Sequence, residues 1–376
     1  MKLSIAQNEL QKGLARIQSI VEKRNTMPIL ANALIEATKG KGKNAGSLSL
    51  AATDLEVGIR GTHPAQIESA GAVTASAKKL FEIVRELPEE SVEISVTSNS
   101  YLEIRCARAQ FSLAGSSAAE YPTLPTFSSE NTATVPSLLL SEMIEKTMYA
   151  ACTDETRYNL NGVYLEILED SAKLRMVATD GHRLSYVDRA LGTDLAGLAN
   201  GVIIPRKGLA ELKRLVDEDD ADEVEIGFEG NSGVARKGDV TLFMRLIEGE
   251  FPKYQQVVPS EIKSQLVIEA AGLTQALRRV ALLSAERSRA VKFELTENRL
   301  CLSSNNPDLG EAREELDVDY AGEDLSIAFN ARYVMDALNA VRAKEIRLGF
   351  QDSMSPARIV PTDDDDTLAV VMPMRV

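Results

Sequence analysis

The spacing of apolar residues predicts one amphipathic helix that occurs three times along the chain. Its copies lie at 77–87, 206–217 and 331–342, each directly after a short apolar segment that is typical of a strand. Within a copy, apolar residues recur at i, i+3, i+4 and i+7, which places one stripe on the helix for burial against a sheet. Ser76 and Asn330 precede two of the copies and are residue types that cap helix N-termini. We therefore expect a strand and then a capped helix at each position.

Strands and further helices complete the predicted repeat. Helices are also expected at 8–23, 139–151 and 273–284, and the segments between helices alternate apolar with polar residues, as antiparallel strands do. The resulting pattern is a β-α-β-β-β unit, used twice per domain and six times per chain. The fold class is α+β, with three tandem copies of one domain.

Repeated phrases mark the three domains independently of the helices. LSLAATD at 48–54, LRMVATD at 174–180 and LCLSSNN at 300–306 recur every 126 residues, about the length of one domain. Polar stretches at 128–135 and 259–264 are predicted linkers. The expected domains are 1–128, 129–259 and 260–376.

Charge is divided unevenly between the predicted helices and the rest of the chain. The net charge of −14 alone disfavours nucleic acid. The six helical segments, however, hold 15 Lys and Arg against 9 Asp and Glu, whereas the remaining residues hold 27 against 47. Ordinary solvated helix faces would also be basic, but the acidic remainder makes the contrast more informative.

Composition excludes several classes of protein. No apolar run approaches the roughly 18 residues of a membrane-spanning helix, and the first residues lack the apolar core of a signal peptide. Three cysteines without metal-binding spacing suit a reducing cytoplasm. With two histidines, no tryptophan and no glycine-rich phosphate loop, neither a metal site nor a cofactor is expected, and nucleic acid would be held through backbone charge.

Asp180, His182 and Arg183 form the one cluster that could suggest catalysis. A histidine beside a carboxylate can act as a base, but the chain has no recognisable nucleophile motif. The same Thr-Asp pair recurs at 53–54 without a histidine, which favours a structural turn after a strand. An enzyme that uses Asp180 and His182 therefore remains only an unfavoured alternative.

Two features near the C-terminus need separate interpretations. The acidic run at 363–366 is expected to be a solvated turn, because four consecutive aspartates cannot all face one ion. The last residues, VVMPMRV, are apolar where chain ends are usually polar. They must be packed as a strand or offered to a partner peptide, and methionines suit such an adaptable surface.

Taken together, the motifs resemble one known family. NLNGVYLE, ATDGHRL, VIIPRKGLAEL, GEFPKYQQVVP, FNARYVMDALNA and VVMPMRV are similar to segments of the bacterial DNA polymerase III β subunit family, the replicative sliding clamps, over the whole chain in order. The resemblance implies two protomers joined head to tail in a ring of six clamp domains, with helices inside and antiparallel sheets outside. Twelve inner helices spaced about 8–10 Å apart would form a circle wide enough for duplex DNA.

The resemblance also implies a function. The protein would be a non-catalytic processivity factor that encircles duplex DNA without reading its sequence. Through linear peptides it would bind the replicative polymerase, the clamp loader and repair polymerases. It would be cytoplasmic and nucleoid-associated, with no cofactor, metal or membrane. A paralogous clamp dedicated to repair or antibiotic resistance is the alternative.

The resemblance assigns site residues in three groups. Implied DNA contacts are Arg24, Lys78, Tyr158, Arg206, Lys207 and Arg332. The implied peptide groove consists of Leu160, Thr179, Gly181, His182, Arg183, Leu184, Pro252, Val257, Val370, Met372, Pro373, Met374 and Arg375. The implied dimer interface consists of Arg108, Phe111, Leu282, Leu283, Asp308 and Glu311. Gln256, Pro356 and Asn159 depart from the residues common in the family, so the peptide preference at the groove rim is open.

Overall fold

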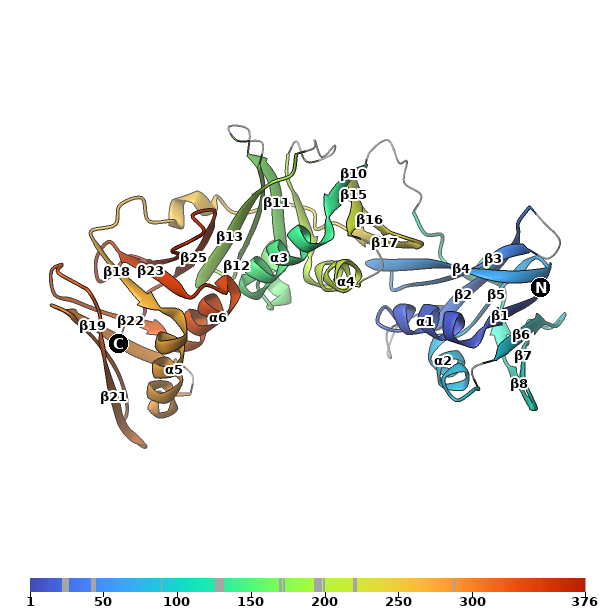
Figure 1. Ribbon diagram of the computed structural model, residues 1–376, viewed down its shortest axis with the longest axis horizontal. Coiled ribbons are helices and arrows are strands. Elements are labelled where there is room, and N and C mark those ends of the chain that lie inside the picture. Colours follow the sequence, from blue (N-terminus) through green and yellow to red (C-terminus); the bar gives the residue numbers. More distant parts are fainter. Residues whose placement is uncertain are drawn as a thin grey trace. The chain divides into compact units, whose positions relative to one another are not determined.

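The computed structural model describes residues 1–21, 27–41, 45–88, 90–125, 132–168, 171, 173–192, 198, 200–218, 222–286 and 288–375. These residues form two compact units (Figure 1). The first unit comprises Met1–Leu138 and Ala210–Leu246, and the second comprises Leu139–Gly192, Leu198–Leu209 and Ile247–Val376.

The predicted β-α-β-β-β unit is confirmed six times within the described residues. The first two copies are β1 (Lys2–Ala6), α1 (Gln7–Ile17), β2 (Asn32–Lys39), β3 (Ala45–Thr53) and β4 (Val57–Ser69), then β5 (Gly71–Ser76), α2 (Ala77–Arg85), β6 (Ser91–Val96), β7 (Leu102–Cys106) and β8 (Ala109–Leu113). The next two are β10 (Thr132–Pro136), α3 (Ser137–Thr147), β11 (Gly162–Leu168), β12 (Lys173–Thr179) and β13 (Arg183–Ala190), then β14 (Val202–Pro205), α4 (Arg206–Val216), β15 (Glu223–Glu229), β16 (Ser232–Lys237) and β17 (Val240–Arg245). The last two are β18 (Ser264–Glu269), α5 (Ala270–Val280), β19 (Ala290–Thr296), β20 (Arg299–Asn306) and β21 (Gly310–Asp317), then β22 (Leu325–Asn330), α6 (Ala331–Val341), β23 (Glu345–Phe350), β24 (Ala357–Pro361) and β25 (Thr367–Val371).

Short elements connect these units. They are the two-residue strand β9 (Gly115–Ser116) and the 3-10 turns η1 (Pro28–Ala31), η2 (Ala118–Glu120), η4 (Met148–Ala150), η5 (Glu155–Leu160), η6 (Tyr254–Val257) and η7 (Ala281–Leu283). Among the residues that the structure describes, no helix is long and apolar enough to cross a membrane.

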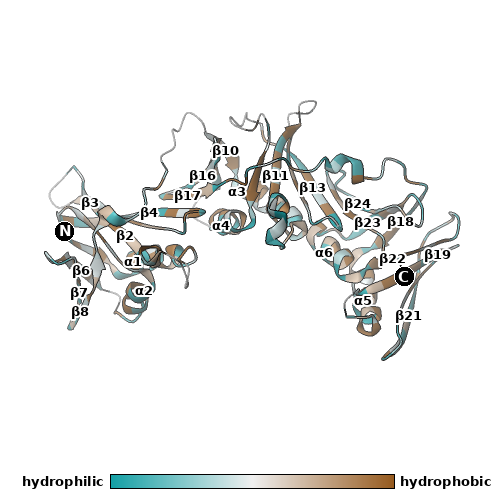
Figure 2. Ribbon diagram, turned by 180° about the vertical axis from the view of Figure 1, so that it is seen from behind, coloured by the Kyte–Doolittle hydropathy of each residue, from teal (hydrophilic) through white to brown (hydrophobic). Residues whose placement is uncertain are grey.

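Every strand pairing within the named strands is antiparallel, as the alternating sequence predicts. In the first unit, the main sheet has the order β10-β15-β16-β17-β4-β1-β6-β7-β8. In the second, one sheet has the order β14-β11-β12-β13-β25-β24-β23-β18, and a smaller one the order β21-β20-β19-β22. The C-terminal strand β25 therefore lies between two strands in the middle of a sheet. In Figure 2 the strands change between teal and brown along their length, which shows the same alternation of polar and apolar residues.

The helices follow from their apolar stripes and caps. On α2, Leu80 and Val84 are fully buried, and the Ser76 hydroxyl accepts a hydrogen bond from the backbone N–H of Lys79. On α6, the Asn330 side chain accepts from the N–H of Arg332 at 3.0 Å. Both predicted N-caps are confirmed. Each cap satisfies a backbone donor that the first helical turn leaves unpaired.

Several sequence-based boundaries were wrong. The helix predicted at 139–151 is α3, which begins at Ser137 and ends at Thr147. Helix α5 begins at Ala270, three residues before the predicted start, because the small residues of its first turn carry no apolar periodicity. Helix α1 ends at Ile17 instead of continuing to 23. The predicted linker at 128–135 includes part of strand β10, whose Ala133 and Val135 are buried against β15.

The acidic run is a solvated turn only in part. Asp364 lies in a half-buried cluster, where its carboxylate accepts hydrogen bonds from Lys146 at 2.9 Å and Arg189 at 2.7 Å. Asp366 pairs with Lys173, and Asp365 with Arg347. Basic residues more than a dozen positions away thus supply counter-ions to the run. Asp364 is not solvated as predicted, whereas Asp363 and Asp365 are exposed.

Candidate functional site

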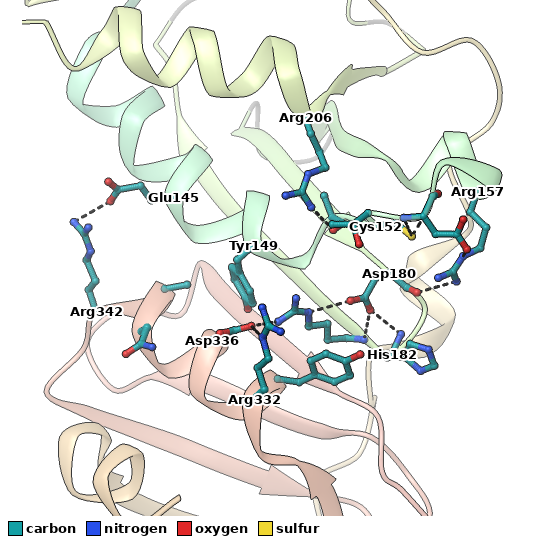
Figure 3. Close-up of a pocket in the computed structure, with 17 residues that line it drawn as sticks. Glu145, Tyr149, Cys152, Arg157, Asp180, His182, Arg206, Arg332, Asp336 and Arg342 are labelled. Atoms are coloured by element: carbon teal, nitrogen blue, oxygen red, sulfur yellow. Dashed lines mark hydrogen bonds and ion pairs between the residues drawn. The ribbon is translucent and has the colours of Figure 1, made fainter. Parts of the chain in front are cut away.

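The second unit contains a hollow with a volume of about 770 Å³. It lies between α3, the segment that joins α3 to β11, the loop between β12 and β13, the start of α4, and α6 (Figure 3). Acidic, basic and aromatic side chains line it: Glu145, Tyr149, Asp154, Arg157, Asp180, His182, Arg183, Arg206, Arg332, Tyr333, Asp336 and Arg342.

The loop between β12 and β13 supplies one wall of this hollow. The Asp180 carboxylate accepts the backbone N–H groups of His182 and Arg183 at 2.9 and 3.0 Å. The Thr179 hydroxyl donates to the carbonyl of Arg183 at 2.6 Å and accepts the N–H of Gly181 at 3.1 Å. Gly181 has φ +85°, a conformation that glycine adopts without steric cost. Side chains of Thr179 and Asp180 therefore hold the turn, as the structural interpretation of this motif predicts.

Arg183 is the most highly connected side chain of the hollow. Its guanidinium lies 4.6 Å from the ring centre of Tyr333 and 5.3 Å from that of Tyr149. It donates to Asp180 at 3.1 Å and to Asp336 at 2.6 Å. Burial opposes its charge, but the two carboxylates outweigh burial and raise the pKa of Arg183. Burial also raises the pKa of Tyr149 to about 12, so this phenol stays protonated beside the guanidinium.

Four further arginines surround the hollow. Arg157 donates to the carbonyl of Asp180 and Arg206 to that of Ala151, each at 2.9 Å. Arg342 pairs with Glu145 at 2.8 Å, and Arg332 lies 3.8 Å from Asp336. Figure 3 shows these side chains reaching the hollow from several elements. Because the Arg332 side chain is 61% exposed and its ion pair is long, it retains capacity to contact a phosphate.

The structure brings together residues that the resemblance placed in different sites. Arg206 and Arg332, implied DNA contacts, line the same hollow as His182 and Arg183, implied groove residues. Of the other implied DNA contacts, Tyr158 is 59% exposed on η5, and Lys207 follows Arg206 on α4. Lys78 lies exposed on α2 of the first unit, 3.7 Å from Glu82. Arg24 lies outside the described residues.

The implied groove residues gather around the junction of β13 and β25. Leu184 pairs with Val370 in the sheet, and the N–H of Met372 donates to the carbonyl of His182 at 2.9 Å. Leu184 and Val370 belong to one buried apolar cluster, against which Val257 packs. The ATDGHRL segment and the apolar tail are thus hydrogen-bonded neighbours, and the first two tail residues, Val370 and Val371, are packed in strand β25.

The remaining groove residues differ in exposure. Leu160 and Thr179 are buried, whereas Met372, Pro373 and Met374 are half-buried, and Pro252 and Arg375 are exposed. The N–H of Met374 donates to the carbonyl of Ala328 at 2.7 Å, which ties the tail to β22. Of the three departures, Gln256 is exposed on η6 and Pro356 is half-buried, and the Asn159 amide donates to the carbonyl of Glu250 at 3.2 Å.

Of the implied dimer residues, four lie on or beside edge strands and two lie on the 3-10 turn η7. Arg108 is in the turn between β7 and β8 and Phe111 is on β8, which ends the main sheet of the first unit in the described part of the chain. Leu282 is 76% exposed on η7, beside the half-buried Leu283. Glu311 is exposed on β21, and Asp308 is exposed just before that strand. Within the described residues, β21 is an edge strand of the small sheet in the second unit. Edge strands with exposed apolar neighbours are surfaces that other chains can pair with.

Sequence reasoning missed several residues that shape the hollow. Tyr149, Tyr333 and Asp336 surround Arg183, and none of the three was among the expected site residues. Among the described residues, no group of three or more His, Cys, Asp or Glu could hold a metal ion. The carboxylate of Asp180 is engaged by its own loop and by Arg183, which gives the enzyme alternative no support.

Comparison with known proteins accounts for the whole chain. Models of the N-terminal, central and C-terminal domains of the DNA polymerase III beta subunit match residues 1–125, 134–253 and 255–375. The chain is 37% identical to the beta sliding clamps of Caulobacter vibrioides and Escherichia coli, over the full length of each protein. The crystal structure of a sliding clamp from Bartonella birtlesii bound to griselimycin superimposes with a TM-score of 0.93 at 35% identity, and the match covers both chains completely. The chain therefore belongs to the DNA polymerase III beta subunit family, the bacterial beta sliding clamps.

Proposed function

We propose that this protein is the processivity clamp of a bacterial replicative polymerase. Two chains would close head to tail into a ring around duplex DNA and slide without reading its sequence. Family membership over the whole chain is the observation that carries this proposal. The matched ranges also support domain boundaries at 1–128, 129–259 and 260–376.

The DNA contacts would be loose and electrostatic. Exposed Lys78 and Arg332 and the partly exposed Arg206 and Lys207 would neutralise phosphates. Tyr158 and Arg24 are the further proposed contacts. Such contacts are sequence-independent and weaken with salt. The net charge of −14 would repel DNA from the rest of the surface, which favours a threaded complex over adhesion.

Partner peptides would bind at the junction of β13 and β25. The half-buried methionines of the tail and the apolar cluster beneath Leu184 and Val370 offer an adaptable apolar surface. The polymerase catalytic subunit, the clamp loader and repair polymerases are the proposed partners. The protein would have no catalytic role of its own and would reside in the cytoplasm with the nucleoid.

Dimerisation is the most direct test of the assembly. We propose that β8, with Arg108 and Phe111, meets η7 and β21 of a second copy, which carry Leu282, Leu283, Asp308 and Glu311. Sedimentation analysis should then give twice the chain mass of 40.9 kDa. Phe111→Asp together with Leu282→Asp should shift the protein to the monomer mass. A wild-type monomer at micromolar concentration would contradict the proposal.

A further inference from the structure

The loop before β4 is a structural copy of the loop before β13. The Asp54 carboxylate accepts the N–H groups of Glu56 and Val57 at 2.9 and 2.7 Å, as Asp180 does for its own two following amides. The Thr53 hydroxyl donates to the carbonyl of Val57 at 2.9 Å and accepts the N–H of Leu55 at 3.0 Å, as Thr179 does in its loop. The two loops therefore share one hydrogen-bonded frame.

The same strand pairing flanks both loops. In the first unit β17 pairs with β4, and the N–H of Arg245 donates to the carbonyl of Glu56 at 2.7 Å. In the second unit β25 pairs with β13, and Met372 donates to His182 in the corresponding way. The frame on which the proposed peptide groove is built thus occurs a second time in the chain.

This second frame opens onto a cavity of its own, with a volume of about 310 Å³. Leu55, Leu124, Phe243 and Met244 supply much of its apolar lining. Leu124 and Phe243 belong to a buried apolar cluster of the first unit, so the floor of the cavity is continuous with the core. A cavity of this size and lining suits an apolar side chain of a ligand.

Leu55 has an unfavourable conformation for its residue type. Its φ is +79° at the position where the other loop has Gly181 at +85°, and the residue is 50% exposed. A bulky side chain in the left-handed region costs free energy, and its exposed apolar area contributes little to folding. Strain of this kind persists mainly where it serves a function. Contact with a partner would use this exposed side chain.

The charges at the cavity rim indicate the chemistry of that partner. Arg245 is exposed, and its guanidinium has neither a hydrogen bond nor an ion pair within the part of the chain that the structure describes. A carboxylate would complement it. Glu56, exposed on the same rim, disfavours a polyanion such as nucleic acid.

We propose that this cavity binds one short extended peptide of a partner protein, through an aliphatic side chain on Leu55 and Phe243 and a neighbouring carboxylate on Arg245. This inference takes one thing from the proposed function, namely that the ligand is a peptide of a partner protein. It adds a second docking site per chain, in the first unit, distinct from the groove at β13 and β25.

Methionine methyl groups can report the two sites separately. Met244 lines the new cavity, whereas Met374 belongs to the proposed groove. In the full-length protein with ¹³C-methyl methionine, the probe acetyl-Ala-Leu-Asp-Gly-amide should shift the Met244 methyl resonance saturably. The matched probe acetyl-Ala-Leu-Asn-Gly-amide, which lacks the charge, should bind more weakly by up to about fivefold, the upper end for one exposed ion pair. A polymerase-derived peptide read at Met374 tests the groove independently.

Two variants test the contacts. Arg245→Gln should abolish the difference between the two probes. Leu55→Gly should keep the thermal midpoint nearly unchanged, because relief of strain offsets the added chain entropy, while it lowers probe affinity. At about 10 mM probe, even a weak site with a Kd of about 1 mM would be mostly occupied. An unshifted Met244 resonance at this concentration would overturn the proposal. So would probe binding that both variants leave intact.

Discussion

Asp336 on α6 lies 2.6 Å from the guanidinium of Arg183 on β13, and the same carboxylate oxygen lies 3.8 Å from Arg332. One carboxylate thus joins an arginine implied in peptide binding to an arginine implied in DNA binding. Tyr149 and Tyr333 hold the Arg183 side chain beside it. This arrangement makes Arg183 a connection between β13 and α6.

Asp336→Asn should therefore lower stability. Arg183 is only 12% exposed and would keep a single carboxylate partner, so we expect a loss of about 1–3 kcal/mol in the free energy of unfolding. Urea denaturation measures this loss. Glu297→Gln, at an exposed residue of the same unit, is the matched control and should change stability by less than about 0.5 kcal/mol. Equal effects of the two variants would refute the role assigned to Asp336.

Acid should destabilise the cluster around Asp364. Burial opposes ionisation there, but hydrogen bonds from Thr367, Arg189 and Lys146 outweigh it and hold the pKa of Asp364 well below its usual range. Because the pKa is lower in the folded state, the stabilisation is present above about pH 4, the ordinary aspartate value, and is lost as the pH falls below it. Thermal midpoints from pH 7 to pH 3 should fall less steeply below pH 4 for Asp364→Asn than for the wild type. If the thermal midpoints of Asp364→Asn and the wild type fall equally with pH, ionised Asp364 does not supply this stabilisation.

His63 should contribute a separate pH dependence at higher pH. It is 3% exposed in the first unit, where burial lowers its pKa despite the Glu9 carboxylate 3.3 Å away, and Arg16 and Lys12 oppose its charge as well. The unfolded chain takes up a proton near pH 6.5 and the folded chain does so only at lower pH, so stability should decrease as the pH falls through 6.5. Histidine NMR should show a resonance that titrates below the free value. If the His63 resonance titrates at or above pH 6.5, this account is contradicted.

Charge removal on the helices should weaken retention on DNA in proportion to the phosphates contacted. Arg332→Gln and Lys78→Gln should each reduce the slope of log affinity against log salt by up to about 0.9, the value for one phosphate contact on duplex DNA. Lys292→Gln, on strand β19 and paired with Glu294, is the control and should leave the slope unchanged. If Lys292→Gln reduced the slope as much as the two helix variants do, the helices would not be the preferred DNA-contacting elements.

Shortening the tail should abolish peptide binding while the assembly persists. Removal of Met374–Val376 deletes the bridge from Met374 to Ala328 and one methionine of the proposed groove, but leaves strand β25 paired on both sides. We expect loss of binding of a polymerase-derived peptide in a titration, with the sedimentation coefficient of the assembly unchanged. Unchanged peptide affinity would place the groove elsewhere.

Local patterns predicted much of this fold because local interactions determine it. The β-α-β-β-β order, the caps at Ser76 and Asn330 and the turn at Thr53 and Asp54 depend on residues a few positions apart. Contacts between distant residues could not be predicted in this way. The hydrogen bond from Lys146 to Asp364 spans 218 positions, and that from Arg183 to Asp336 spans 153. The burial and pairing of Asp364 within the acidic run were missed for this reason.

The central claim is that the protein encircles DNA. Release of the protein from circular and from linear DNA tests this claim most directly. The protein should be placed on nicked circular DNA by a clamp loader, and the circle then cut once by a restriction enzyme at a salt concentration that suppresses phosphate contacts. A topologically linked ring should stay on the intact circle for many minutes and leave the linear product within seconds. Equal release from both forms would contradict a ring that holds DNA by topology.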